Sequence, residues 1–247
     1  MKIALPLIVA LTTAAPVMAQ DTIINPAQSI TVDLGIGANY KPTYQGSDDQ
    51  DTSAWFIFRN FSYSGRENAG RAFSLTPSLG YVGERDSGDD DRLEGMDKIN
   101  RAYELGLKAS WRAGATEGYV TARKGFGGHK GITGEFGTRY RIEASDQLTL
   151  WAGLEAGYGD DTYNETYFGV TATEARRSAY TEYQPSGGIN MAGASLEARY
   201  ELAPNTAVLG ELKYSRIIGD AADSPLVMEE NQPSVKLGIV RTLNFAF

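Results

Sequence analysis

The chain contains no cysteine and only one histidine, His129, in 247 residues. Without cysteine there is no disulfide scaffold, no cysteine-based zinc site and no lipid-modified N-terminal cysteine. A single histidine with no nucleophile placed beside it in the sequence argues against catalysis. We therefore expect no enzyme activity, no cofactor and no metal site.

Long apolar runs and an excess of positive charge are also missing. Beyond the N-terminus no run of about 20 apolar residues could cross a membrane as a helix. The chain has 23 Lys and Arg against 31 Asp and Glu, which makes it a poor partner for nucleic acid. In the strands of a membrane barrel apolar and polar residues alternate, so their mean hydropathy is low although they cross the membrane. A barrel is therefore compatible with this composition.

The first 19 residues have the pattern of a secretory signal peptide. Lys2 gives a short positive start, residues 3–17 are almost all apolar or small, and Val17-Met18-Ala19 offers small residues before the expected cleavage site. An uncleaved membrane anchor is the alternative, for which the apolar stretch is short. We expect a removed signal peptide (1–19) followed by one domain (20–247).

Apolar and polar residues alternate over long stretches of the mature chain. In 147–158, for example, apolar residues at every second position alternate with Thr149, Trp151 and Glu155. A period of two places each set on one face of a β-strand. Soluble sandwiches also alternate, but the stretches here run for about 10–12 residues, whereas strands of soluble proteins average about 5–6. That length is typical of tilted membrane-crossing strands.

Ten such stretches are separated by clusters of Gly, Asp, Asn and Pro. Short connections between them alternate with connections that are mostly long. The sequence therefore predicts an all-β fold, a closed transmembrane antiparallel β-barrel of about ten strands, with short periplasmic turns and long outer loops. An extra hairpin between 166–171 and 180–183 would give twelve strands. The predicted strands are 29–40, 53–63, 71–83, 102–112, 117–126, 132–142, 147–158, 187–202, 206–217 and 234–247.

The charged residues of these strands share the polar face. An Arg or Lys that faces lipid near the bilayer midplane costs about 2–4 kcal/mol, so this face must point inward and fill the lumen with side chains. Arg241 is the exception, because it shares its parity with the apolar face; either a β-bulge shifts the register or the side chain snorkels. The inward set is Asp33, Glu104, Lys108, Arg112, Glu135, Arg139, Arg141, Glu155, Glu197, Arg199, Glu211 and Lys213.

Aromatic residues lie toward the ends of the apolar sets, where a barrel has its interfacial girdles. The chain also ends in an alternating segment, 243–247, with a terminal aromatic, which is similar to the C-terminal signature that the barrel insertion machinery reads. The girdle candidates are Tyr40, Tyr103, Trp111, Tyr140, Tyr158, Tyr200 and Tyr214.

Acidic residues cluster in two predicted outer loops, 48–51 and 86–91. Their oxygens could hold Ca²⁺ or Mg²⁺ beside anionic lipopolysaccharide, although the spacing does not match an EF-hand loop. Solvated loop charge is the simpler interpretation of these clusters.

Several segments in order carry a family resemblance. They are 40–49 (YKPTYQGSDD), 79–81 with Arg85-Asp86, 93–96 and 104–106, then 127–131 (GGHKG), 163–170 (YNETYFGV) and 219–226 (GDAADSPL). Together with Phe247 they resemble the MipA/OmpV family, or MltA-interacting proteins, of Gram-negative outer membranes. The family more often has Glu where Gln45 stands. The motif positions taken as structural or interaction residues are Tyr40, Gly46, Ser47, Arg85, His129, Tyr167, Phe168, Gly169, Asp220, Asp223, Ser224, Pro225 and Phe247.

The resemblance implies an outer-membrane barrel without catalytic activity. The name-giving member is a scaffold that links a lytic murein transglycosylase to a bifunctional murein synthase in peptidoglycan assembly. Expected partners are thus outer-membrane lipid and lipopolysaccharide, the insertion machinery, and these two murein enzymes. Other members are associated with adhesion, osmotic response or antibiotic uptake, so a small-solute channel and a surface adhesin stay open as alternatives.

Most of the motifs lie in or beside the outer loops, away from the periplasm. This placement predicts that they fold the loops over the barrel mouth, with Asp220 and Asp223 capping turns and Pro225 ending one.

Overall fold

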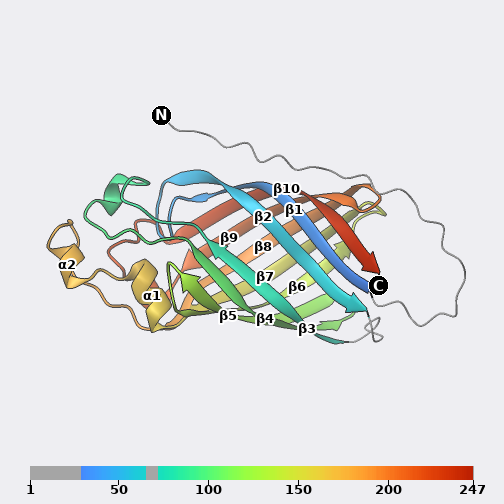
Figure 1. Cartoon of the computed structure of the whole chain (residues 1–247), viewed down its shortest axis with the longest axis horizontal. Helices are drawn as coiled ribbons and strands as arrows, with labels where there is room; N and C mark the ends of the chain where they lie inside the picture. The colour runs from blue at the N-terminus through green and yellow to red at the C-terminus, as the bar shows by residue number, and fades with distance from the viewer. Residues whose placement is uncertain (1–28, 65–71, 247) are drawn as a thin grey trace, which may run out of the picture.

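The computed structural model describes residues 29–64 and 72–246, and ten antiparallel strands in this part form one strongly curled sheet (Figure 1). The expected signal peptide, the segment 65–71 and Phe247 lie outside the described residues. The strands are β1 (Ser29–Pro42), β2 (Gln50–Ser64), β3 (Phe73–Val82), β4 (Ala102–Ala113), β5 (Thr116–Gly127), β6 (Ile132–Glu143), β7 (Leu148–Gly159), β8 (Gly188–Ala203), β9 (Thr206–Ile217) and β10 (Asn231–Ala246).

The strand order is β2-β1-β10-β9-β8-β7-β6-β5-β4-β3, so the first strand lies between the second and the last. Within the described residues no ladder joins β2 to β3, and closure of the barrel therefore stays a prediction. The middle of β3 holds Pro77, which has no backbone N–H to donate. Proline inside a sheet is found on edge strands, in agreement with β3 as an edge of this one.

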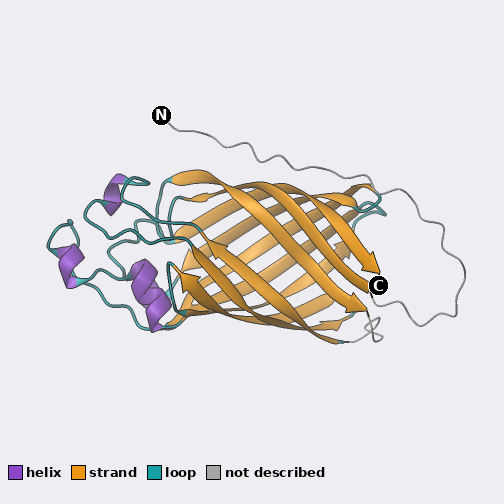
Figure 2. Cartoon of the chain, in the orientation of Figure 1, coloured by secondary structure: helices purple, strands orange, loops and turns teal. Residues whose placement is uncertain are grey.

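Long and short connections lie at opposite ends of the strands (Figure 2). The long ones carry α1 (Asp161–Phe168), α2 (Ala172–Ala175) and two 3₁₀ turns, η1 (Asp91–Leu93) and η2 (Gly219–Ala221). The short ones include 114–115, 144–147 and 204–205. The predicted asymmetry of barrel loops is confirmed, and the ten predicted strands agree with the observed ones to within about three residues at their ends.

The twelve-strand alternative is wrong. The segment 160–187 forms two short helices, and only one bridge, Val170 to Tyr183, remains of the proposed hairpin. Side-chain caps explain this, because Asp160 accepts a hydrogen bond from the backbone of Tyr163 and Thr171 forms a capping box with Glu174. No helix in the described part of the chain is long and apolar enough to span a membrane.

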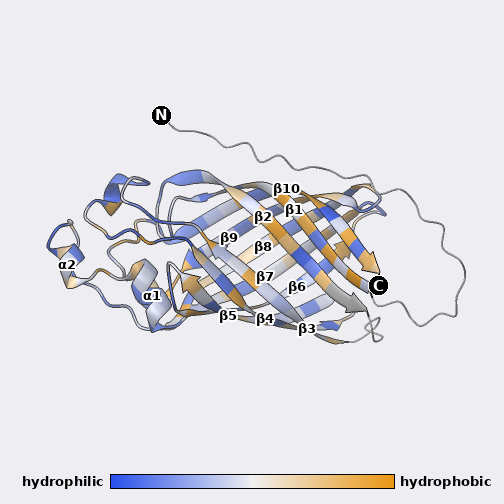
Figure 3. Cartoon of the chain, viewed as in Figure 1, coloured by the Kyte–Doolittle hydropathy of each residue, from blue (hydrophilic) through white to orange (hydrophobic). Residues whose placement is uncertain are grey.

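The outer face of the sheet is apolar and exposed, whereas charged residues are buried inside. Ile36 and Leu237 are 61% and 62% exposed, but Asp33 is only 3% exposed. Figure 3 shows hydrophobic residues along the strands and hydrophilic ones over the long loops. Large apolar side chains arranged around the outside of a sheet need a lipid environment, so this face meets the membrane.

Arg241 faces outward at the rim of the short-turn end. Its register is continuous, opposite Leu34 on one side and Thr206 on the other, so the bulge interpretation is wrong. Thr206 is the first residue of β9 after the 204–205 turn. Arg241 therefore lies at the interface level, where a long cationic side chain can reach water.

The outward position of Ile239, near the middle of β10, gives a stability test. We expect Ile239→Arg to destabilise the folded protein by about 2–4 kcal/mol, because a cation would face the hydrocarbon core. Equilibrium urea unfolding in lipid vesicles measures this, with Arg241→Leu as the control that should lose little or nothing. Equal losses in both variants would contradict the assignment of the lipid face.

Candidate functional site

The long loops fold together over one end of the sheet and form a packed layer, here termed the loop cap. It comprises residues 43–49, 83–101, 128–131, 160–187 and 218–230. Two apolar clusters hold it together, which freely solvated loops would not form. Their buried members are Ile99, Tyr163, Tyr167, Phe168, Ile217 and Ala221 in one cluster, and Tyr44, Leu93, Met96, Val170 and Leu226 in the other.

Gly46 and Ser47 tie the first loop to the last one and to the second. Gly46 has φ of +102°, and a Cβ there would lie 2.8 Å from a side-chain carbon of Val227. Its carbonyl accepts hydrogen bonds from the backbone of Met228 and Glu229 at 2.7 and 3.0 Å. The fully buried Ser47 donates its hydroxyl to Asp90 at 3.0 Å. Both motif positions therefore have structural contacts that depend on the residue present.

Arg85 and Ser224 join the second and the last loop to the loop that carries α1. The guanidinium of buried Arg85 donates to the backbone carbonyl of Tyr167 at 2.7 Å. The Ser224 hydroxyl donates to the carbonyl of Phe168 at 2.6 Å. These bonds satisfy the carbonyls at the C-terminus of α1 that have no partner within the helix. Gly169 follows, and a Cβ there would lie 2.4 Å from the carbonyl oxygen of Glu165.

The single histidine lies in the cap segment 128–131 with its side chain fully buried. The ring of His129 packs edge-on against Tyr163 and Tyr167, with centroids 5.1 and 5.6 Å away. Its Nε2 lies 3.3 Å from a carboxylate oxygen of Glu104, in a geometry that makes no hydrogen bond. Thr133 donates to the same carboxylate and not to the ring. The arrangement holds no accessible nucleophile, so His129 has the position of a packing residue between cap and barrel.

The remaining motif residues are not brought into one site. Tyr40 faces outward on β1 and is half exposed. Asp220 accepts a hydrogen bond from the backbone of Ser186 in another loop, and Asp223 is exposed. Pro225 is the second residue of a turn that the Val227 N–H closes on the Ser224 carbonyl, so it begins a turn instead of ending one.

One arginine, Arg92, lies close to carboxylates of both acidic loop clusters. Arg92 contacts Asp48 and lies 3.7 Å from Asp49 and 3.9 Å from Asp90. Asp90 also caps η1 by accepting from the backbone of Arg92. In the described residues no group of three or more acidic or histidine side chains is arranged to hold a metal ion.

Sequence reasoning missed several residues that hold the cap. Glu174 is buried and accepts hydrogen bonds from the backbones of Thr171 and Asp97. The Thr-x-x-Glu spacing of a capping box could have identified it. Asn164 and Asn190 are also buried and bonded to each other at 2.9 Å, and no local pattern predicts that pairing.

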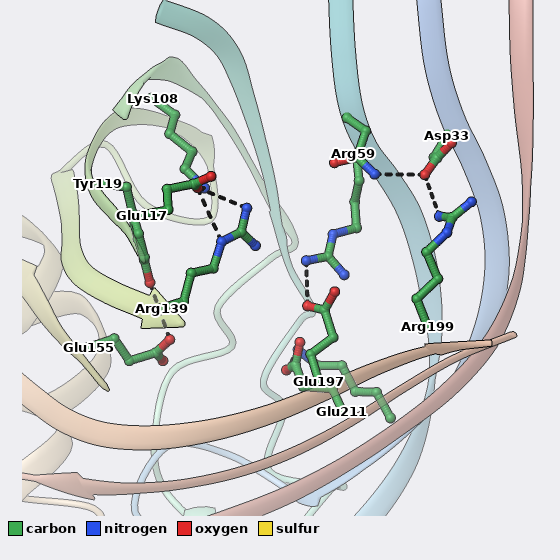
Figure 4. A network of polar contacts seen from close by, with 12 residues as sticks. Asp33, Arg59, Lys108, Glu117, Tyr119, Arg139, Glu155, Glu197, Arg199 and Glu211 are labelled. Atoms are coloured by element: carbon green, nitrogen blue, oxygen red, sulfur yellow. Dashed lines mark hydrogen bonds and ion pairs between the residues drawn. The ribbon is translucent and has the colours of Figure 1, made fainter. Parts of the chain in front are cut away.

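Inside the barrel, ion pairs cross the lumen between strands far apart in sequence (Figure 4). Arg59 pairs with Glu197 at 2.5 Å, and Arg199 with Asp33 at 2.6 Å. Other pairs stay on one part of the sheet. Lys213 pairs with Glu155 across β8, and Lys236–Glu211 (2.7 Å) and Arg139–Glu117 (2.8 Å) are opposite residues on neighbouring strands. The predicted inward placement of charged side chains of both signs, joined in ion pairs, is confirmed.

A model of the family described as MltA-interacting protein MipA matches residues 34–243. The chain belongs to this family. Among curated relatives, the MltA-interacting protein of Escherichia coli K12 is 28% identical over 109 residues, 44% of this chain and 43% of that protein. The putative outer membrane protein YiaT of the same organism is 25% identical over 97 residues, 39% of each chain. The matched segments thus span less than half of these relatives.

Solved outer-membrane proteins are similar in a looser way. The outer membrane protein OprG of Pseudomonas aeruginosa gives a TM-score of 0.31 at 11% identity, covering 90% of this chain and 96% of that one. Neisserial surface protein A gives 0.29 at 9% identity, covering 88% and 97%. With the outward apolar face and relatives named as outer membrane proteins, this MipA-family chain is an outer-membrane protein.

The left-handed conformation of Gly46 predicts a mutational effect confined to the cap. We expect Gly46→Ala to destabilise the cap by about 1–3 kcal/mol, because the methyl group would meet Val227 and φ is unfavourable for alanine. Limited proteolysis of the loops measures it. Gly88→Ala is the matched control, since a Cβ there meets nothing closer than 3.9 Å. Equal proteolysis of both variants would count against a tightly packed cap.

Two buried tyrosines predict how the cap responds to alkali. Burial raises the pKa of Tyr44 and of Tyr163 to about 12 in each case. Because the folded cap favours the protonated form, its contribution is complete below about pH 10 and is lost as the pH rises toward 12. Tyrosinate absorbance should show a late-titrating set of tyrosines that includes Tyr44 and Tyr163, and Tyr44→Phe should remove one tyrosine from that set. Titration of all tyrosines in a single step near pH 10 would refute this.

Proposed function

We propose that this protein is a non-catalytic outer-membrane scaffold in murein assembly, which docks a lytic transglycosylase and a murein synthase at its periplasmic end. The observation that carries the proposal is the family match over residues 34–243, supported by the name of the Escherichia coli relative. The wholly buried His129, with no nucleophile beside it, supports a role without catalysis. Contacts with lipopolysaccharide and with the insertion machinery stay predictions.

The rim at the short-turn end offers the docking surface. It lies at the opposite end from the loop cap, and its turns are too short to form a separate domain. The turn 144–147 is exposed throughout, and Glu143 beside it is exposed as well. Asp146 adds a second carboxylate to this turn. We infer that a partner recognises charged groups on this rim.

A pull-down from native membranes tests the proposal with the tagged full chain. We expect a lytic transglycosylase and a murein synthase among the recovered proteins. Charge reversal at the rim, in a Glu143→Lys/Asp146→Lys double variant, should reduce their recovery several-fold. A matched double variant on the cap, Glu94→Lys/Asp223→Lys, should leave recovery unchanged, because both residues are exposed at the other end.

Recovery of neither enzyme from cross-linked membranes would overturn the scaffold role. If only the cap variant failed to recover the murein enzymes, the docking surface would lie on the cap, on the side of the membrane away from murein. A channel role is disfavoured by the packed cap and the ion pairs across the lumen, since narrow barrels are filled by their own side chains. Large, steady conductance steps in planar bilayers would restore it.

A further inference from the structure

A polar chamber of about 190 Å³ lies within the lumen, between two groups of charged side chains (Figure 4). Residues of β2 and of β4 to β10 line it, among them Lys108, Arg139, Glu135, Glu211 and Trp151. Each water in the liquid occupies about 30 Å³, so the chamber has room for about six waters or for a small organic molecule.

Positive charge is in excess on one wall of the chamber. The carboxylate of Glu117 is shared by three cations, Arg112 at 2.6 Å, Arg139 at 2.8 Å and Lys108 at 3.6 Å. One carboxylate cannot neutralise three cations. Lys108 and Arg139 line the chamber. Because Arg139 donates to Glu117 from Nε and Nη2, its Nη1 group and the Lys108 ammonium are the donors for a further carboxylate.

Negative charge is available beside that wall. Within the described residues Glu135 forms no ion pair, although its carboxylate lines the chamber, and the Tyr119 hydroxyl of the same chamber donates to Glu155 at 3.4 Å. Lys108 and Lys213 act on it only through longer-range attraction. The other chamber carboxylates, Glu155, Glu197 and Glu211, each have a close cation. Glu135 is thus the carboxylate able to accept an ammonium group.

The chamber is covered toward the loop cap and continues toward the short-turn end of the strands. Toward the outer end, the aromatic rings of the loop cap and the buried His129 cover the barrel mouth. Toward the other end, a cavity of about 30 Å³ shares Arg59, Arg139, Trp151 and Glu197 with the chamber and extends to Asn60 and Arg199. Arg199 bonds to Thr242, whose N–H donates to the Asn205 carbonyl in the 204–205 turn at the short-turn rim.

We propose that this chamber binds a small zwitterion, an amino acid or dipeptide with a free ammonium and a free carboxylate, which enters from the periplasm. The ammonium lies against Glu135, and the carboxylate lies against Lys108 and Arg139. A ligand with one charge would leave either the carboxylate or the cations without a partner, and unmatched charge in a confined site is costly. This binding goes beyond the scaffold role and does not depend on any murein enzyme.

Tryptophan fluorescence of the purified full chain tests the proposal. The protein has three tryptophans, and replacing Trp55 and Trp111 by Phe leaves Trp151 in the chamber wall as the only reporter. The probes are alanylalanine, its N-acetyl derivative and its C-terminal amide. We expect saturable binding of the zwitterion, and at least tenfold weaker binding of both singly charged derivatives.

Substitutions of chamber residues test whether the change in Trp151 fluorescence comes from binding in the chamber. Glu135→Gln and Lys108→Gln should each weaken binding of alanylalanine at least tenfold, and Ser195→Met should weaken it by filling the chamber without a charge change. Glu143→Gln, at the exposed rim, is the control and should bind as the parent does. Circular dichroism verifies that each variant keeps its β structure. Absence of binding, equal binding of the three probes, or full binding by Glu135→Gln would each overturn the proposal, whereas pull-down of murein enzymes would be unaffected.

Discussion

The requirement that charges stay out of the hydrocarbon governs this structure. Every strand turns one set of side chains to lipid, so a period of two along the chain becomes an apolar exterior and an ionic interior. Because each inward cation needs a carboxylate, the lumen is crossed by pairs such as Arg59–Glu197 and Arg199–Asp33. These pairs join strands distant in sequence, and breaking one would leave a buried charge without its partner.

The loop cap follows different rules from the strands below it. Its residues satisfy backbone groups at turns and helix ends, as Ser224 does for Phe168 and Arg85 does for Tyr167. The loops of the cap carry 18 acidic and seven basic side chains, so the acidity of the whole protein is concentrated there. The family motifs thus describe how the outer mouth is covered, while the proposed partner surface lies at the other end.

Much of the fold could be predicted from the sequence, because alternation is a local signal that lipid enforces strictly. The strands, the inward charges and the loop asymmetry all follow from it. The helices in 160–187 were missed, since Tyr, Phe and Val in that segment favour strands while the capping residues Asp160 and Thr171 decide the outcome. The position of Arg241 at the rim could be assigned only from the strand register, and the Asn164–Asn190 hydrogen bond only from the tertiary structure. Lumen partners and the chamber depend on which strands face each other, which no local pattern specifies.

Cysteine scanning along β10 tests the central claim most directly, since the native chain has no cysteine to interfere. Single cysteines from position 234 to 240 would each carry a fluorophore in lipid vesicles, with a quencher restricted to the acyl chains. The account predicts strong quenching at 235, 237 and 239 and weak quenching at 234, 236, 238 and 240. Quenching that is uniform along the strand, or that has the opposite parity, would contradict it.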